Sequence, residues 1–559
     1  MTKYDGRLEL TWTNKHLRLL AHEDGTYEWV SPADYRVAEV RLLHDVTTVG
    51  EVGTIRAADN LLIRGDALNA LTSLARLPEF ASEYLGKVKL AYLDPPFNTQ
   101  QSFLQYDDAL EHSVWLTMMR DRVRQAYDLL APDGSVWVHL DDSEVSYCRV
   151  MMDEVFGRQN FVTSIVWKSA DTGNYDAKQF SVDHNTILVY SREPGWRSNR
   201  VPRTEAQRSH YTNPDNDPRG PWFDGNPLGS PNPRENLRYD LISPQGHTVR
   251  HPPNGWRWSR ETLELMMDDG AIRWSADGKR IIYRTYLEDQ QGLPPSTVWA
   301  DTDETGSNRK AKNELKRIFG LSAKQVFDTP KPERLIARIV QIGTDPGDVV
   351  LDCFLGSGTT AAVAHKMNRR WLGIERELTV ISSFALPRLM KVVDGDDLDG
   401  VTRDAGWVGG GGFRVLDIAP SMFEADGGLV FLADWMTNGT LAEATAAQLG
   451  FECEQDPPFA GRKGRTRLAV VDGVVNESVV RLIVSALPEH ERVVVCGTGI
   501  DTDARPVLRE LRPGSTLRKI PAALLDEYRS ARQLRLALGD DAAGSATGNG
   551  AKRSVATKA

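Results

Sequence analysis

The chain has 559 residues, of which 41% are hydrophobic and 26% charged, with a formal net charge of −10. This length and composition predict a globular protein of two to four domains. The negative charge argues against a protein that coats nucleic acid nonspecifically, although one region can still be basic. With neither a long apolar run nor a secretory leader, we expect a cytoplasmic protein without a membrane span. Four isolated cysteines without a CxxC pair predict neither a disulfide framework nor a metal site.

The elements begin with three short alternating segments within residues 1–58, RLELTW, TYEWV and AEVRLL, which predict strands. An α/β rhythm follows, with a strand over 61–63, a turn at 65–66 and an amphipathic helix. The apolar run at 88–93 is typical of a strand covered on both faces of a parallel sheet. That strand ends at the tetrapeptide DPPF, residues 94–97.

The next predicted helix is capped by Ser113 and continues to about Leu130. The turn sequence APDG then leads into a strand over 135–140. This half of the α/β pattern closes with a helix and two strands, at 144–157, 161–167 and 185–191.

The composition changes between about 193 and 307, where Pro, Gly, Asn, Arg and Trp crowd together. α/β order returns near residue 325 with a helix, the strand DVVLD, the loop CFLGSG, a helix and the strand RWLGIE. The glycine-rich WVGGGGF at 407–413 predicts a boundary before a second small α/β region, which extends to about 538. The polar, small-residue tail after it is expected to be disordered.

The glycine loop after DVVLD has the layout of a nucleoside-cofactor site. Gly356 and Gly358 let the backbone approach a ligand where a Cβ would clash. Glu375, at the end of the next strand, is placed to accept hydrogen bonds from both hydroxyls of a ribose. One alternative is a tight turn that binds no ligand. An NAD-binding fingerprint, GxGxxG or GxGxxA, also stays possible, because Ala361 stands at its last position. The loop lacks the lysine of a P-loop.

The first DPPF predicts a pocket for a planar amine. Asp94 stands where an apolar strand ends, and the two prolines after it leave carbonyls that can only accept hydrogen bonds. Phe97 adds an aromatic face beside these acceptors. The alternative is an ordinary Pro-Pro turn.

Taken together, the motifs resemble the beta class of amino-methylating DNA methyltransferases, which use S-adenosylmethionine (SAM). DPPF precedes FLGSG at 354–358, TPKPERLI at 329–336 lies just before that loop, and GDALNAL at 65–71 lies before DPPF. Further stretches, among them LLAPDGSVWVHLDDSE and MMDEVFGRQNFVTSIVW, are similar to the modification subunits of type III restriction–modification systems. The resemblance covers roughly residues 59–395.

This resemblance implies a Rossmann-like SAM-dependent methyltransferase fold, α/β and circularly permuted, with an inserted target-recognition domain and a small C-terminal α/β domain. The domains expected are an N-terminal extension at 1–58, a catalytic half at 59–192, the recognition insertion at 193–322, a SAM-binding half at 323–395, the C-terminal domain at 396–538 and the tail at 539–559.

The resemblance also assigns roles to individual residues. The target base would be held by Asp94, Pro95, Pro96 and Phe97. The SAM site would be formed by Asp66, Thr329, Lys331, Pro332, Asp352, Phe354, Gly356, Gly358, Thr359 and Glu375. Of these, Thr329, Lys331 and Pro332 would hold the methionine portion, and Asp66 would lie near the cofactor adenine. For Asp66 the alternative is a turn residue that starts a helix.

The implied reaction is methylation of the adenine N6 amine in double-stranded DNA, by base flipping and direct displacement. Asp at the first motif position favours adenine over the N4 amine of cytosine, which stays the alternative. A C5-cytosine enzyme would need a cysteine after a proline, and none of the four cysteines follows one. A homodimer and a separate restriction subunit are partners that the sequence leaves open.

The insertion interleaves arginines and tryptophans, which suit phosphate contacts, guanine edges and stacking on bases. A loop-rich insertion with a solvated face is the alternative. The residues concerned are Arg197, Arg200, Arg203, Arg208, Arg219, Arg234, Arg238, Arg250, Arg257, Arg260, Trp196, Trp222, Trp256 and Trp258.

A second DPPF, at 456–459, follows the polar stretch FECEQ, so we expect a surface turn there and no site. The glycine pair in VVVCGTGI is likewise expected to be a coincidence, in a C-terminal domain suited to dimerisation or partner contact. Two wider alternatives remain: a Rossmann-type oxidoreductase, and a DNA-binding specificity protein with an inactive catalytic centre.

Overall fold

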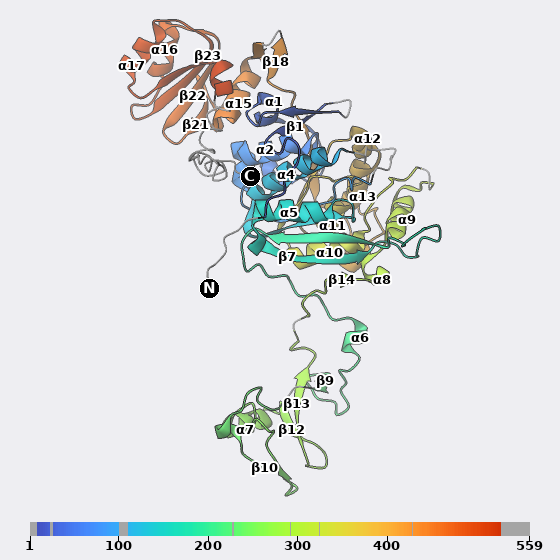
Figure 1. Ribbon diagram of the computed structural model, residues 1–559. Helices are drawn as coiled ribbons and strands as arrows, with labels where there is room; N and C mark the ends of the chain where they lie inside the picture. The colour runs from blue at the N-terminus through green and yellow to red at the C-terminus, as the bar shows by residue number, and fades with distance from the viewer. Residues whose placement is uncertain are drawn as a thin grey trace, which may run out of the picture. The chain divides into compact units, whose positions relative to one another are not determined.

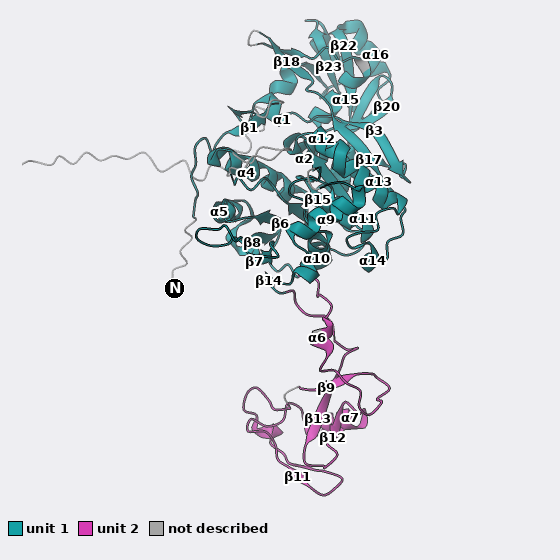
Figure 2. Cartoon of the chain, turned by 90° about the vertical axis from the view of Figure 1, so that its right-hand side faces the viewer, with its two compact units in different colours: residues 1–197, 296–559 teal, residues 198–295 magenta. Residues whose placement is uncertain are grey.

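The computed structural model describes residues 8–22, 26–99, 110–225, 228–290, 292–322, 325–426 and 429–526. The chain divides into two compact units (Figure 2): unit 1 comprises residues 1–197 and 296–559, and unit 2 comprises residues 198–295. Unit 2 lies inside the predicted insertion at 193–322, whose last residues belong to unit 1 and include helix α9 (Asn308–Phe319). In the part of the chain described here, no helix combines the length and the apolar character that a membrane crossing needs.

Unit 1 is built on a ten-stranded mixed sheet in the order β14-β7-β8-β6-β5-β15-β16-β4-β17-β3. The six strands from β6 to β17 are parallel to their neighbours, whereas β8 runs antiparallel to β6, and β3 antiparallel to β17. In sheet order the strands are β14 (Val298–Trp299), β7 (Phe161–Lys168), β8 (His184–Ser191), β6 (Leu130–Leu140), β5 (Val88–Leu93), β15 (Val349–Asp352), β16 (Arg370–Glu375), β4 (Asn60–Arg64), β17 (Gly412–Ile418) and β3 (Leu43–Gly50). The predicted α/β class is confirmed.

The central strands are apolar on both faces because helices cover both faces of the sheet. Every residue of β15 is buried, and in β5 only Lys89 is partly exposed. These helices form two groups, one from the first half of the chain and one from the second, and the helices within each group pack against one another (Figure 1). They are α2 (Ala67–Arg76), α4 (His112–Leu129) and α5 (Val145–Phe156), and α10 (Glu333–Gly343), α11 (Thr359–Lys366) and α13 (Leu386–Asp394).

The strand order creates a switch point between β5 and β15. From β5 the chain continues to β6 on one side, and from β15 it continues to β16 on the other. In open parallel sheets, ligands bind in the crevice outside the carboxyl ends of the strands at such a point. The first DPPF and the glycine loop both begin at these carboxyl ends.

The N-terminal strand predictions were partly wrong. Residues 8–12 of RLELTW form no strand, because Leu10 N donates to Glu154 (2.7 Å) and the Trp12 indole donates to Thr117 (2.8 Å) on α4. AEVRLL becomes a strand only from Leu43, because the Gln448 side-chain amide binds both backbone groups of Val40. TYEWV does form β2 (Tyr27–Val30), paired with β1 (Arg18–Ala21).

Other boundaries also moved. Glu111, not Ser113, caps α4, since its carboxylate accepts the N–H groups of Ser113 and Val114. β6 begins at Leu130 and includes the APDG sequence, at a register shift against β5. The glycine run 409–411, where each residue has positive φ, turns the chain into β17, so the main sheet extends past the predicted boundary at 407–413.

A second sheet, in the order β20-β21-β22-β23-β24, forms the small C-terminal α/β region. Helices α16 (Glu477–Ser485) and α17 (Ala504–Leu511) pack against each other beside it, and α15 (Asn438–Leu449) contacts β22. The strands are β20 (Glu452–Asp456), β21 (Phe459–Lys463), β22 (Thr466–Val475), β23 (Arg492–Ile500) and β24 (Thr516–Lys519).

Unit 2 has its own small core beneath helix α7 (Arg260–Asp268). A three-stranded sheet joins β12 (Ile272–Trp274), β13 (Ile281–Tyr286) and β9 (Trp222–Asp224). Trp256 is only 2% exposed and its indole donates to the Tyr239 carbonyl at 2.6 Å. The sequence had suggested that Trp256 could stack on a base. Its burial shows that it is a core residue instead.

Candidate active site

The switch point contains a cavity of about 550 Å³. Twelve of the fourteen residues that the sequence singled out line this one cavity, although they come from two distant parts of the chain. They are Asp66, Asp94, Pro95, Pro96, Phe97, Thr329, Lys331, Asp352, Phe354, Gly356, Thr359 and Glu375. Pro332 and Gly358 are not among the lining residues.

The two oxygens of Asp94 have different surroundings. Oδ2 accepts a hydrogen bond from Lys331 Nζ at 2.6 Å. Oδ1 is buried, and no partner for it is found among the described residues. Burial raises the pKa of Asp94, and the charge of Lys331 and its hydrogen bond act in the opposite direction. Oδ2 is thus held in place, and Oδ1 is available to accept a hydrogen bond from a donor that enters the cavity.

Lys331 lies just before α10, which is capped at Pro332. Its side chain is only 8% exposed, and its ammonium lies 4.9 Å from the centre of the Phe97 ring. The sequence assigned Lys331 to the methionine portion of the cofactor, whereas the structure pairs it with Asp94. A buried ammonium beside an aromatic face and a carboxylate is stabilised by both.

A stack of aromatic groups fixes Phe97. Its ring stacks on His139 with centroids 5.7 Å apart, and His139 Nδ1 lies 2.9 Å from the Tyr92 hydroxyl. Burial lowers the pKa of His139 well below its usual range, so the imidazole beside Lys331 is neutral. The Trp115 indole donates to the Pro96 carbonyl at 2.7 Å. No hydrogen bond to the Pro95 carbonyl occurs within the described ranges, so this oxygen can also accept.

Gly356 and Gly358 have different structural roles in the loop. Gly356 has a φ of +52° and lines the cavity, where an added Cβ would come within 3.4 Å of the Phe327 ring. Gly358 has a φ of +83°, and a Cβ there would lie 3.2 Å from the Ala385 backbone. Gly358 therefore allows α11 to start close to the π-helical turn at Ile381–Ala385, and only Gly356 leaves room for a ligand.

Glu375, the last residue of β16, also lines the cavity. Its Oε2 accepts Gly356 N–H at 2.7 Å, and its Oε1 accepts the N–H groups of Arg376 and Glu377, both at 2.9 Å. Burial raises the pKa of Glu375 and these three donors lower it. Each carboxylate oxygen has two lone pairs, so after these three hydrogen bonds Oε2 keeps one lone pair that can accept from a hydroxyl.

Two further carboxylates have partners within the protein. Asp66 caps α2 by accepting Leu68 N–H at 2.7 Å, and it pairs with Arg122 at 2.9 Å. Asp66 therefore starts a helix, as its alternative interpretation has it. It also lines the cavity, so its role toward the cofactor stays a prediction. Asp352 accepts Phe354 N–H at 2.9 Å, and burial raises its pKa to about 7.

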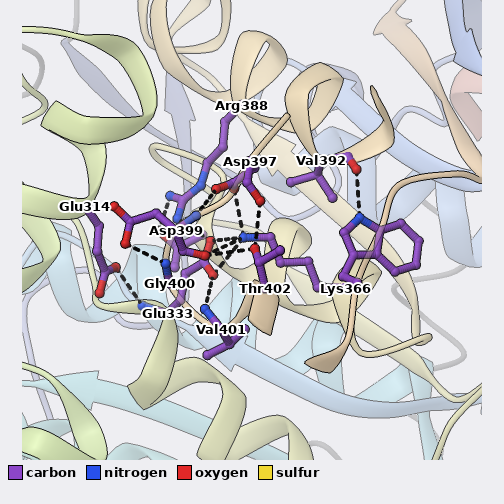
Figure 3. A network of polar contacts seen from close by, with 12 residues as sticks. Glu314, Glu333, Lys366, Arg388, Val392, Asp397, Asp399, Gly400, Val401 and Thr402 are labelled. Atoms are coloured by element: carbon purple, nitrogen blue, oxygen red, sulfur yellow. Dashed lines mark hydrogen bonds and ion pairs between the residues drawn. The ribbon is translucent and has the colours of Figure 1, made fainter. Parts of the chain in front are cut away.

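A buried ionic network (Figure 3) joins α10 and α13 to α11, the helix that follows the glycine loop. Lys366, on α11, pairs with Glu333 and with Asp397, both at 2.8 Å, and these three side chains have no exposed surface. Arg388, on α13, joins Glu333 at 2.8 Å to the Thr359 hydroxyl at 2.8 Å. Helices α10, α11 and α13 are thereby tied to a residue that lines the cavity.

The sequence interpretation missed several residues of this site. His139, Trp115 and Arg122 are buried next to predicted residues, and each binds one of them. His139 stands in the apolar run VWVHL at the end of β6, where a lone histidine is a weak signal. Trp115 and Arg122 lie about two helical turns apart on α4, among residues that have the pattern of an ordinary buried face.

A model of the DNA methylase family with N6 and N4 amine specificity matches residues 88–385, just over half of the chain. The "Probable type III restriction-modification enzyme HindVI Mod subunit" of Haemophilus influenzae is 30% identical over 438 residues, covering 65% of this chain and 54% of that protein. The type III restriction-modification enzyme EcoP15I Mod subunit of Escherichia coli is 28% identical, covering 56% and 57%. The chain spans about half the length of the curated relatives it matches.

Two solved structures are also similar. The cytosine-N4-specific PvuII DNA methyltransferase is 15% identical with a TM-score of 0.33, covering 59% of this chain and 86% of that one. The complex of M1.HpyAVI with SAM is 15% identical with a TM-score of 0.29, covering 59% and 99%. The family match runs against the oxidoreductase alternative, since that family is one of DNA methylases.

Proposed function

The chain belongs to the N6/N4 DNA methylase family, and from that premise we propose that it transfers a methyl group from SAM to the N6 amine of adenine in double-stranded DNA. The observation that carries this proposal is the shared cavity, in which Asp94 lies with Gly356 and Glu375. Asp94 Oδ1 is a buried acceptor without a partner in the described chain, and an exocyclic amine is a donor that fits it.

The residues present fit SAM as the cofactor. Gly356 keeps the loop free of a Cβ, Glu375 Oε2 keeps one lone pair for a hydroxyl, and the cavity of about 550 Å³ is within the range of small-molecule sites. SAM would supply the sulfonium methyl group. Asp352 and Thr329 line the same cavity near the glycine loop and are proposed contacts to the cofactor's amino-acid end. For the cofactor adenine, Asp66 is the proposed neighbour.

Asp94 is proposed to activate the amine. The lone pair of an exocyclic amine is delocalised into the base, so the nitrogen is a poor nucleophile. Hydrogen bonds from its two N–H groups to Asp94 Oδ1 and the Pro95 carbonyl favour a tetrahedral nitrogen, whose lone pair then points out of the ring plane. With SAM bound, its methyl group would pass from sulfur to this nitrogen in one displacement that leaves a neutral thioether, and Asp94 would accept the proton that the nitrogen gives up.

Phe97 is proposed to stack on the extruded base. A base within the duplex cannot reach a buried carboxylate, so it must leave its stack. The ring of Phe97 is held by His139 on one side and approached by Lys331, and it lines the cavity next to Asp94. These contacts pre-orient the aromatic surface before the base arrives.

The DNA outside the cavity is proposed to be recognised by unit 2. This unit contains a cavity of about 400 Å³ lined by three arginines, Arg200, Arg203 and Arg208. Clustered guanidinium groups suit phosphates and guanine edges. We further propose the permuted beta-class order of the fold and a homodimer. By similarity to the Mod subunits of type III restriction-modification enzymes, we also propose a separate restriction subunit as a partner.

The family model covers both amines, so N4-cytosine is the second candidate product. Long-read methylome sequencing of a host that expresses the wild type or Asp94→Ala tests the proposal. The expected result is one sequence motif with an N6-methyladenine signal that disappears only in the variant. An N4-methylcytosine signal would replace the proposed base, and no Asp94-dependent signal at all would leave a DNA-binding protein without catalytic activity.

A further inference from the structure

The loop between β7 and β8, residues 169–183, displays two aromatic side chains to solvent. Tyr175 is 103% exposed and Phe180 is 89% exposed. Large aromatic side chains normally bury most of their surface, so two of them fully exposed on one loop mark a surface that is covered by a partner. In Figure 1 the connection extends beyond the ends of the two strands, on the side of α9.

The base of this loop belongs to the candidate active site. Ser169, Val182, His184 and Asn185 line the same cavity as Asp94 and Phe97. These residues lie on the DPPF side, together with Lys331, and not beside the glycine loop's partner Glu375. The two exposed aromatics therefore stand on a loop whose base lines this cavity.

The loop is held by a set of local hydrogen bonds. Its two ends are joined by Ser169 N–H donating to the Asp183 carbonyl at 2.9 Å, and the Ser169 carbonyl accepts from Asn308 N–H on α9 at 2.9 Å. Asp171 pairs with Arg309 of α9 at 2.8 Å. Within the loop, Asn174 N–H donates to the Ser181 hydroxyl at 2.6 Å. The aromatic side chains are thus presented on a defined backbone.

The charge of the loop points to stacking and not to phosphate binding. Residues 169–183 contain Asp171, Asp176 and Asp183 against the single Lys178. A phosphate-binding loop would be basic, because electrostatic attraction dominates binding to the DNA backbone. The exposed rings of Tyr175 and Phe180 are therefore the parts of this loop suited to DNA, because an aromatic side chain can stack on the face of a base.

From these observations we propose that Tyr175 and Phe180 enter the duplex and occupy the space that the target base leaves when it moves into the cavity. This inference depends on the proposed function, since it deepens the account of base flipping. Inserted apolar side chains are a known way to keep unstacked base steps open. Filling the gap stabilises the extruded state and so increases the fraction of bound DNA that can react.

The test compares two duplexes that contain the methylation site, one fully paired and one with the target adenine mispaired. Extrusion of a mispaired base costs less free energy, so it depends less on a side chain that fills the gap. The double variant Tyr175→Ala with Phe180→Ala is expected to methylate the paired duplex about ten-fold or more slowly than wild type. On the mispaired duplex its rate is expected to return to within about three-fold of wild type.

Phe431→Ala is the matched control, because Phe431 is 49% exposed on β19 (Leu429–Leu432) and does not line the cavity. It should change neither rate. An equal loss on both duplexes, or no loss on the paired duplex, overturns the inference while wild-type activity upholds the proposed function. A wild type that methylates no duplex overturns the proposed function and this inference with it. Unchanged SAM binding by the double variant is part of the expected result.

Discussion

The chain contains the same tetrapeptide twice, and the two copies adopt different structures. Asp94-Pro95-Pro96-Phe97 follows a buried parallel strand at the switch point of a ten-stranded sheet. Asp456-Pro457-Pro458-Phe459 forms the turn of a hairpin, in which Asp456 pairs with Phe459 across β20 and β21. The expectation of a surface turn for the second copy is confirmed, and its first three residues are exposed.

Their carboxylates differ accordingly. The Asp94 side chain is 17% exposed and binds an ammonium that is itself buried. The Asp456 side chain is 59% exposed and lies 3.4 Å from Arg467, which also pairs with Glu454 and Glu491. In the first copy the aromatic ring lines a cavity, and in the second it is 5% exposed in the C-terminal core. Burial and topology, not the four letters, distinguish a site from a turn.

The largest expected effect comes from removing each aspartate in turn. Asp94→Ala should lower the rate of methyl transfer by roughly a thousand-fold or more, because it removes the acceptor that activates the amine. Asp456→Ala should leave this rate unchanged. Transfer of a radiolabelled methyl group from SAM to DNA measures both. A comparable loss in the two variants would show that the comparison has no functional meaning.

The fold was readable from the sequence where apolar runs are continuous. Strands at 88–93 and 370–375 fall within a residue of their predicted limits, because a strand buried on both faces is an almost continuous apolar run. The N-terminal segments were misjudged because Gln448 and Glu154 bind their backbone groups from distant elements. Such long-range competition leaves no trace in local alternation.

A second prediction concerns the only partner found for Asp94 in the described chain, Lys331. Burial raises the pKa of Asp94 and Lys331 opposes this. Lys331→Met should therefore raise that pKa further, and since the carboxylate is the active form, the acid limb of the rate profile should move to higher pH by about one unit. The rate at its plateau should fall roughly ten- to hundred-fold, because Asp94 Oδ2 loses its anchor.

Two controls separate this role from cofactor binding. Lys331→Arg keeps the charge and should restore part of the rate and most of the original pH profile. Lys463→Met removes an exposed lysine near the second DPPF, on β21, and should change nothing. If Lys331 instead held the methionine portion of SAM, Lys331→Met would raise the KM for SAM and leave the acid limb where it was.

The third prediction extends the comparison to the two glycine pairs. Gly356→Ala places a methyl group in left-handed backbone beside the cavity, and should weaken SAM binding by roughly ten-fold. Gly499 lies inside β23, where a Cβ would come within 2.9 Å of Val474, so Gly499→Ala should lower thermal stability. Calorimetric titration with SAM should find the Gly499→Ala affinity equal to that of the wild type.

The candidate site was predictable in its parts but not in its pairings. The motif order identified which loops would meet, and twelve of the named residues do line one cavity. The Lys331–Asp94 ion pair joins residues 237 positions apart, and the Phe97–His139 stack joins two different strand ends. Spacing along the chain cannot specify which side chain a lysine reaches, because that depends on how α10 is placed against the sheet.

The smallest expected effect concerns a buried carboxylate that lies outside both DPPF tetrapeptides. Glu314, on α9, accepts Glu333 N–H at 3.1 Å, and burial raises its pKa to about 7 from 4.5. As pH rises through this interval, the unfolded chain loses its proton first, so the carboxylate lowers the free energy of unfolding. Glu314→Gln stays neutral and can still accept that N–H. Its stability relative to wild type should therefore rise between about pH 5 and pH 8, by on the order of 1 kcal/mol.

Thermal unfolding across this pH range measures the effect. Asp456→Asn is the matched control, since it neutralises an exposed carboxylate of the second DPPF and should shift the Tm little. A gain for Glu314→Gln that does not grow with pH would mean that the network around Glu333 already stabilises the ionised Glu314. In that case the attraction of the Arg388 charge outweighs the cost of burying the Glu314 carboxylate. Burial alone would then not explain why carboxylates in the half that contains the cavity differ from those in the C-terminal region.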